Sequence, residues 1–131
     1  MSILVGYVDT PEGHAALETG IAEATLRGER LVVVNSPRRG APVDDDMVDG
    51  DHVRSLRTRA AEAGVDLDVR QPLHGESLAD TLDALAREVD ASLLVIGLRH
   101  RTPVGKLILG STAQRILLES GLPVLTVKAP R

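Results

Sequence analysis

Short apolar runs recur along this chain, separated by longer stretches in which apolar and polar residues mix. An unbroken apolar run of four to eight residues is typical of a strand covered on both faces, whereas strict alternation indicates a strand with one exposed face. Val65, Leu67 and Val69 alternate with polar residues, and the other runs are continuous. The pattern predicts strands at residues 3–8, 31–34, 65–69, 92–96 and 122–127.

The stretches between these runs carry apolar residues at helical spacing. In the first of them, Leu17, Ile21 and Ala24 share one helix face. Each stretch is also bounded by residues that start or stop helices, such as proline in the first turn and glycine after the last. The expected boundaries are Pro11 and Gly28, about Met47 and Gly64, and Ser111 and Gly121; the third helix is expected to begin at Gly75 and Ser77, with a buried stripe that extends to Val89.

Strands that alternate with helices imply βαβ units and a parallel sheet. We therefore expect an α/β fold in which residues 1–131 form a single domain: a doubly wound five-stranded parallel sheet, order 3-2-1-4-5, with helices on both faces. Ligands of such sheets bind outside the carboxyl ends of the strands, where the strand order reverses. Asp9, Asn35 with Ser36, and the loop after Gly97 would meet at that edge.

Composition excludes several classes of protein. Hydrophobic residues make up 43% and charged residues 26% of the chain, and no apolar run approaches the roughly 20 residues of a membrane-spanning helix. The absence of cysteine excludes disulfides and thiolate catalysis. Tyr7 is the only Phe, Trp or Tyr residue and the pI is about 5.5, which disfavours binding of nucleic acid. We expect a cytoplasmic protein without nucleic-acid or membrane partners.

The segment from Gly97 to Thr112 combines glycines, cations and a predicted helix start. Gly97 follows one of the most apolar runs, and Gly110 precedes Ser111 and Thr112 at the start of a helix. Glycine lets the backbone approach a ligand closely, and the unpaired N–H groups of a helix N-terminus attract anions. Three basic residues lie in this segment although the net charge is -4: Arg99, Arg101 and Lys106. The segment predicts a phosphate-binding loop.

The chain resembles the universal stress protein family over essentially its whole length, from VGYVDTPEG at residues 5–13 to GLPVLTV at residues 121–127. The nucleotide-binding branch of that family carries a glycine, two residues, a second glycine, nine residues, and then glycine followed by serine or threonine. Gly97, His100 and Gly110-Ser111 keep this spacing, but His100 replaces the second glycine.

The resemblance implies binding of ATP or a related adenine nucleotide with Mg²⁺. Asp9 would lie near the ribose and the metal, and the backbone around Ser36 near adenine. His100 would either donate to the phosphates or narrow their pocket. The resemblance also implies a homodimer through the last strand, residues 122–128, whose apolar edge invites pairing. The candidate ligand-binding residues are Asp9, Thr10, Ser36, Gly97, Arg99, His100, Gly110, Ser111 and Thr112.

Other interpretations of the same residues stay open. Asp9 could be only the N-cap of the following helix, and a chain that had lost the nucleotide would be an interaction protein of the same fold. A phosphoacceptor receiver domain is disfavoured, since residues 66–75 do not end a strand in aspartate. His14, His52 and His74 show no metal spacing and are expected at the surface or in loops. No spacing predicts a catalytic centre, so we expect at most slow ATP hydrolysis.

Overall fold

The computed structural model describes residues 1–35, 48–72, 77–98 and 111–129. Its elements alternate along the chain as the apolar runs predict. The strands are β1 (Ser2–Gly6), β2 (Arg30–Val34), β3 (Leu67–Arg70), β4 (Ala91–Leu98) and β5 (Val124–Lys128). The helices are α1 (Pro11–Arg27), α2 (Gly50–Glu62), α3 (Leu78–Glu88) and α4 (Ser111–Glu119).

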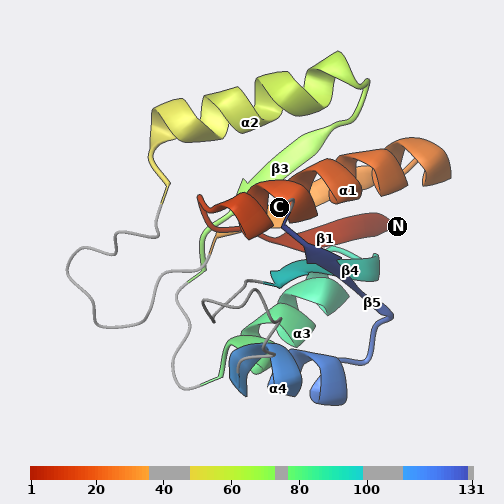
Figure 1. Ribbon diagram of the computed structural model, residues 1–131. Helices are drawn as coiled ribbons and strands as arrows, with labels where there is room; N and C mark the ends of the chain where they lie inside the picture. The colour runs from red at the N-terminus through yellow and green to blue at the C-terminus, as the bar shows by residue number, and fades with distance from the viewer. Residues whose placement is uncertain (36–47, 73–76, 99–110, 130–131) are drawn as a thin grey trace.

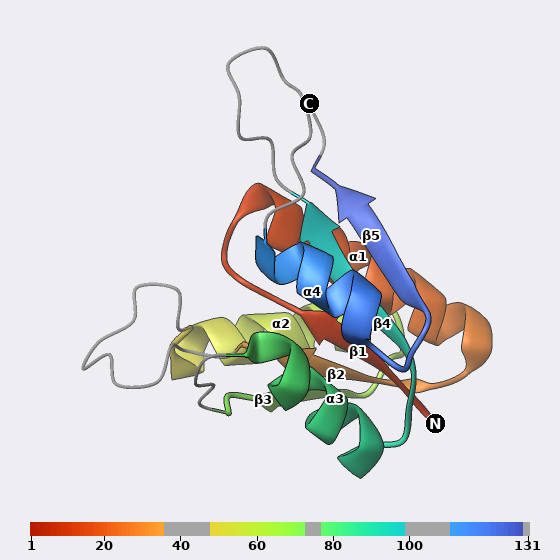
Figure 2. The ribbon, with the colours of Figure 1, turned by 90° about the horizontal axis from the view of Figure 1, so that it is seen from below.

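The strands form one parallel sheet in the order β3-β2-β1-β4-β5, which confirms the predicted topology. Helices α1 and α2 cover one face, and α3 and α4 cover the other (Figure 1). Seen from the second face, the sheet lies behind α3 and α4, with β5 along its outer edge (Figure 2).

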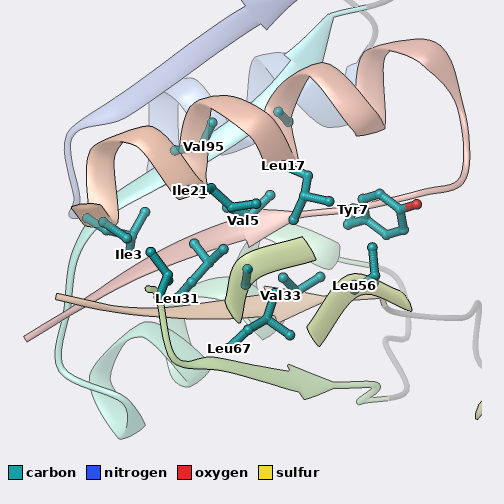
Figure 3. Packing of buried hydrophobic residues seen from close by; sticks show 14 of the residues in the cluster. Ile3, Val5, Tyr7, Leu17, Ile21, Leu31, Val33, Leu56, Leu67 and Val95 are labelled. Carbon is teal, nitrogen blue, oxygen red and sulfur yellow. The ribbon is translucent and has the colours of Figure 1, made fainter. Parts of the chain in front are cut away.

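Successive residues of each central strand point to opposite faces, and both faces are buried. In β1, Ile3 and Val5 pack into the cluster beneath α1 and α2, whereas Leu4 packs into the cluster beneath α3 and α4. The same alternation holds in β2 and β4, which explains why these strands read as continuous apolar runs. The first cluster ends at Tyr7, whose hydroxyl points away from the aliphatic side chains (Figure 3).

The helix ends follow the expected capping chemistry. The Ser77 hydroxyl accepts from the N–H of Asp80, and Gly28 ends α1 in the left-handed conformation with φ of 65°. Helix α2 begins at Gly50 rather than near Met47, because Asp49 is its N-cap and accepts from the N–H of His52. Strand β5 begins at Val124, after Pro123, which has no N–H to give to a sheet.

Candidate functional site

The carboxyl end of β1 leads directly into helix α1. The Thr10 hydroxyl caps this helix by accepting from the N–H of Gly13 at 3.1 Å, and Pro11 takes the first helical position. The interpretation of Asp9 as the N-cap is therefore wrong. Because the Thr10 hydroxyl accepts from the first turn of α1, the Asp9 carboxylate is not needed as a cap and can interact with other side chains.

Asp9 lies in a polar group that we call the Asp9 cluster, made of Tyr7, Asp9, His14 and His52. The Nε2 atom of His14, in the first turn of α1, lies 2.7 Å from Asp9 Oδ1. The Nδ1 atom of His52, in the first turn of α2, lies 3.7 Å from Asp9 Oδ2. The Tyr7 hydroxyl lies 2.7 Å from His52 Nε2 and 3.4 Å from His14 Nε2. Three separate segments thus meet around one carboxylate.

The protonation state of Tyr7 determines what its hydroxyl can do in the hydrogen bonds of this cluster. Tyr7 is 2% exposed, and burial, with the charge of Asp9 as a second cause, raises the pKa of its phenol well above the ordinary value. The phenol therefore stays neutral, and its hydroxyl can donate to Nε2 of His52 or accept from it. Donation to Nε2 would place the proton of a neutral ring on Nδ1, which faces Asp9. His52 thus links Tyr7 to the Asp9 carboxylate through one contact of 2.7 Å and one longer contact of 3.7 Å.

A second polar group links the ends of the neighbouring strands. Asn35 follows β2, is 1% exposed, and donates from Nδ2 to the Tyr7 carbonyl at 3.0 Å. Its Oδ1 atom accepts from the N–H of Val48 at 2.9 Å and from Gln71 Nε2 at 3.1 Å. Asn35 therefore joins the segments after β1, β2 and β3 to Val48, two residues before α2.

Gly97, near the end of β4, packs against the start of α1. A Cβ atom built on Gly97 would lie 2.7 Å from the carbonyl carbon of Glu12, closer than real Cβ atoms approach a neighbour. The absence of a side chain here is explained by contact between β4 and α1. The same contact brings Gly97 to the edge of the sheet at which Asp9 lies.

The candidate binding residues fall into three groups. Asp9, Thr10 and Gly97 are brought to one edge of the sheet, between the ends of β1 and β4. Ser111 and Thr112 open helix α4 as expected, and their side chains lie outside the description. The remaining candidates also lie outside the described residues: Ser36, Arg99, His100 and Gly110.

The sequence did not predict the pairing of His14 with His52. They were expected as separate surface or loop residues, yet their ring centroids lie 6.3 Å apart. His14 follows Asp9 by five residues, a spacing that could have placed it within reach of the carboxylate across the first helical turn. Nothing local marks His52, because its position depends on how α2 packs. Within the described residues, no three His, Cys, Asp or Glu side chains are arranged to hold a metal.

No helix in the described part of the chain is long and apolar enough to cross a membrane. The chain matches the model of the universal stress protein family over residues 1–128.

Individual relatives agree with this match. A universal stress protein of Mycolicibacterium smegmatis is 45% identical over 126 residues, which cover 96% of each chain. The solved structure of a universal stress protein from Archaeoglobus fulgidus has a TM-score of 0.81 and 31% identity over 98% of both chains. A universal stress protein solved in complex with cAMP has a TM-score of 0.72 and 25% identity, covering 99% of this chain and 98% of its own. The protein belongs to the universal stress protein family.

Proposed function

We propose that this protein is a stress-response regulatory protein that binds ATP or a related adenine nucleotide at the carboxyl ends of β1 and β4. The observation that carries the proposal is the Asp9 carboxylate, which is 57% exposed at this edge of the sheet. A carboxylate placed there can accept from the hydroxyls of a ribose. A family member solved with cAMP supports an adenine nucleotide as the ligand.

The residues at this edge fit the other parts of such a ligand. Helix α4 begins at Ser111, and its first N–H groups offer the positive end of a helix to phosphate. One carboxylate suits Mg²⁺, which proteins commonly bind through one or two carboxylates together with the phosphates of the substrate. In this proposal, Asp9 would face the ribose and the metal, and the residues around Ser111 would face the phosphates.

Replacing Asp9 by asparagine should weaken binding of Mg²⁺-ATP about tenfold, since a hydrogen bond to a charged group contributes roughly 1.5–3 kcal/mol. Isothermal titration calorimetry of the wild type and the variant measures the loss. Asp90→Asn is the matched control. It removes the same charge from an exposed position that precedes β4, at the amino-terminal ends of the strands and away from the proposed site. Asparagine also tolerates the positive φ of residue 90.

The absence of both heat and thermal stabilisation with millimolar ATP or cAMP would contradict the proposed function. The fold would then serve an interaction protein without a nucleotide, which is the second candidate. Equal losses in Asp9→Asn and Asp90→Asn would show a general effect of charge and would remove Asp9 from the site.

We also propose that the protein is a homodimer paired through β5, because the two outermost strands of the sheet, β3 and β5, differ in charge. Edge strand β3 carries Asp68 and Arg70, which form an ion pair at 2.8 Å, and charged edges discourage pairing with other chains. Edge strand β5 is half-buried from Val124 to Val127 and carries a charge only at Lys128. The uncharged edge is the one suited to a second copy.

Thr126→Lys should convert the dimer to monomers at micromolar concentration, because two lysines would meet in the middle of the paired edges. Size-exclusion chromatography with light scattering gives the mass, and circular dichroism checks that the variant is folded. Asp68→Asn on β3 is the control and should leave the mass unchanged. A monomeric wild type under these conditions would refute the dimer.

A further inference from the structure

We propose that His14 and His52 are positioning residues that orient the Asp9 carboxylate to accept hydrogen bonds from the ribose hydroxyls of a bound nucleotide. The inference rests on the proposed function and deepens it. It adds two residues to the site and names the part of the ligand that they help to recognise.

The contacts of the Asp9 cluster act on both oxygens of one carboxylate. His14 Nε2 lies 2.7 Å from Oδ1, within hydrogen-bond distance. His52 Nδ1 lies 3.7 Å from Oδ2, where it attracts this oxygen without a short bond. An exposed aspartate otherwise samples several rotamers, and fixing one of them costs conformational entropy. One hydrogen bond to Oδ1 and one longer contact at Oδ2 favour one orientation before the ligand arrives.

The supporting residues hold His52 more firmly than His14. The side chain of His52 is 22% exposed, its Nε2 lies 2.7 Å from the Tyr7 hydroxyl, and its backbone N–H donates to Asp49. Leu56, one turn further along α2, is buried in the core and anchors that helix. His14 is 51% exposed, so its Nε2–H can adjust as a ligand approaches. Tyr7 thus supports the carboxylate through His52.

The chemistry of the carboxylate determines which part of a nucleotide can face it. A carboxylate accepts about four hydrogen bonds. His14 occupies one of these acceptor positions, and 57% of the Asp9 side chain remains exposed. A phosphate has no proton to donate at neutral pH and is repelled by the charge of Asp9. The ribose hydroxyls are neutral donors that suit the remaining acceptor positions.

Calorimetry with ATP and with 2′,3′-dideoxy-ATP measures how much the ribose hydroxyls contribute to affinity, because the second nucleotide lacks both hydroxyls. The wild type should bind ATP about tenfold more tightly than the dideoxy form. His14→Ala and His52→Ala should weaken ATP binding about fivefold and leave dideoxy-ATP unchanged. His14→Gln should restore most of the ATP affinity, since the glutamine amide can donate to the same oxygen. Arg57→Ala, an exposed change on α2, should change neither.

A second readout needs no nucleotide. In ¹⁵N-labelled protein at pH 8, the imidazole nitrogen shifts should show His52 protonated on Nδ1 and His14 protonated on Nε2. Asp9→Asn should move the ring signals of both histidines. A His52 ring protonated on Nε2 would overturn the inference, because that nitrogen could no longer accept from Tyr7.

The outcomes distinguish this inference from the proposed function. Equal affinity of the wild type for the two nucleotides would overturn the positioning role and leave nucleotide binding intact. If His14→Ala lost affinity equally for both nucleotides, the positioning role would also be overturned, because a purely structural defect does not depend on the hydroxyls. If the wild type binds neither nucleotide at millimolar concentration, the proposed function fails, and the positioning role fails with it.

Discussion

Gly97→Ala should lower the free energy of unfolding by about 3 kcal/mol, because the added methyl group meets backbone rather than a flexible side chain. The new Cβ would lie 2.7 Å from the carbonyl carbon of Glu12 in the first turn of α1. Relief requires α1 to move away from β4, a shift that would disturb the packing of Leu17 and Ile21 beneath that helix. Urea unfolding followed by circular dichroism measures the change.

Two further glycines provide comparisons for this prediction. Gly13→Ala should be at least as damaging, because its Cβ would lie 2.9 Å from the carbonyl carbon of Val8. Gly50→Ala is the matched control: a Cβ there has nothing within 4 Å, and alanine is the better helix former at the start of α2. Its stability should stay within about 1 kcal/mol of the wild type. A Gly97→Ala variant as stable as Gly50→Ala would contradict the contact between α1 and β4.

The missing side chain of Gly97 is explained equally well by close approach of a ligand and by packing against a helix. The sequence interpretation assigned its missing side chain to close approach of a ligand, whereas the structure shows a helix in that place. A glycine in a ligand motif is therefore also a packing residue, and its presence alone is weak support for binding. For this reason the proposed function rests on Asp9 rather than on the glycines.

The fold could be predicted because each central strand is buried on both faces. Residues Leu31 to Val34 are continuous in apolar character, and the structure divides them between the two clusters in strict alternation. The ends of the elements were harder to predict where side chains compete with the backbone. The N–H of Val48 is bonded to Asn35, and Asp49 caps the next helix, so α2 begins later than its apolar spacing indicated.

The candidate site could be predicted only in part, because some of its members depend on tertiary packing. Asp9 follows a strand and could be placed from the topology alone. His52 lies 43 positions further along the chain and reaches Asp9 only because α2 lies on the same face of the sheet as α1. Burial of Leu56 and the ion pair between Arg59 and Glu18 help to hold α2 there. No local pattern encodes that arrangement.

Asn35→Ala should lower the free energy of unfolding by about 3 kcal/mol, because it leaves buried polar groups without their partner. The Tyr7 carbonyl would lose the donor at 3.0 Å, and the Val48 N–H would lose the acceptor at 2.9 Å. Gln71→Ala is the milder control, with an expected loss of about 1 kcal/mol, since Gln71 is only partly buried and the bond from Val48 to Asn35 survives.

Amide hydrogen exchange identifies which contact is responsible for the Asn35 effect. The Val48 N–H should exchange much faster in Asn35→Ala than in Gln71→Ala, because only the first change removes its acceptor. Loss of the bond to the Tyr7 carbonyl should also loosen the segment that carries Asp9, so the His14 and His52 ring signals should shift in the same variant. If neither the free energy of unfolding nor the exchange rate of the Val48 N–H changed, Asn35 would not join the strand ends. Its hydrogen bond to the Tyr7 carbonyl would then not help to hold the segment that carries Asp9.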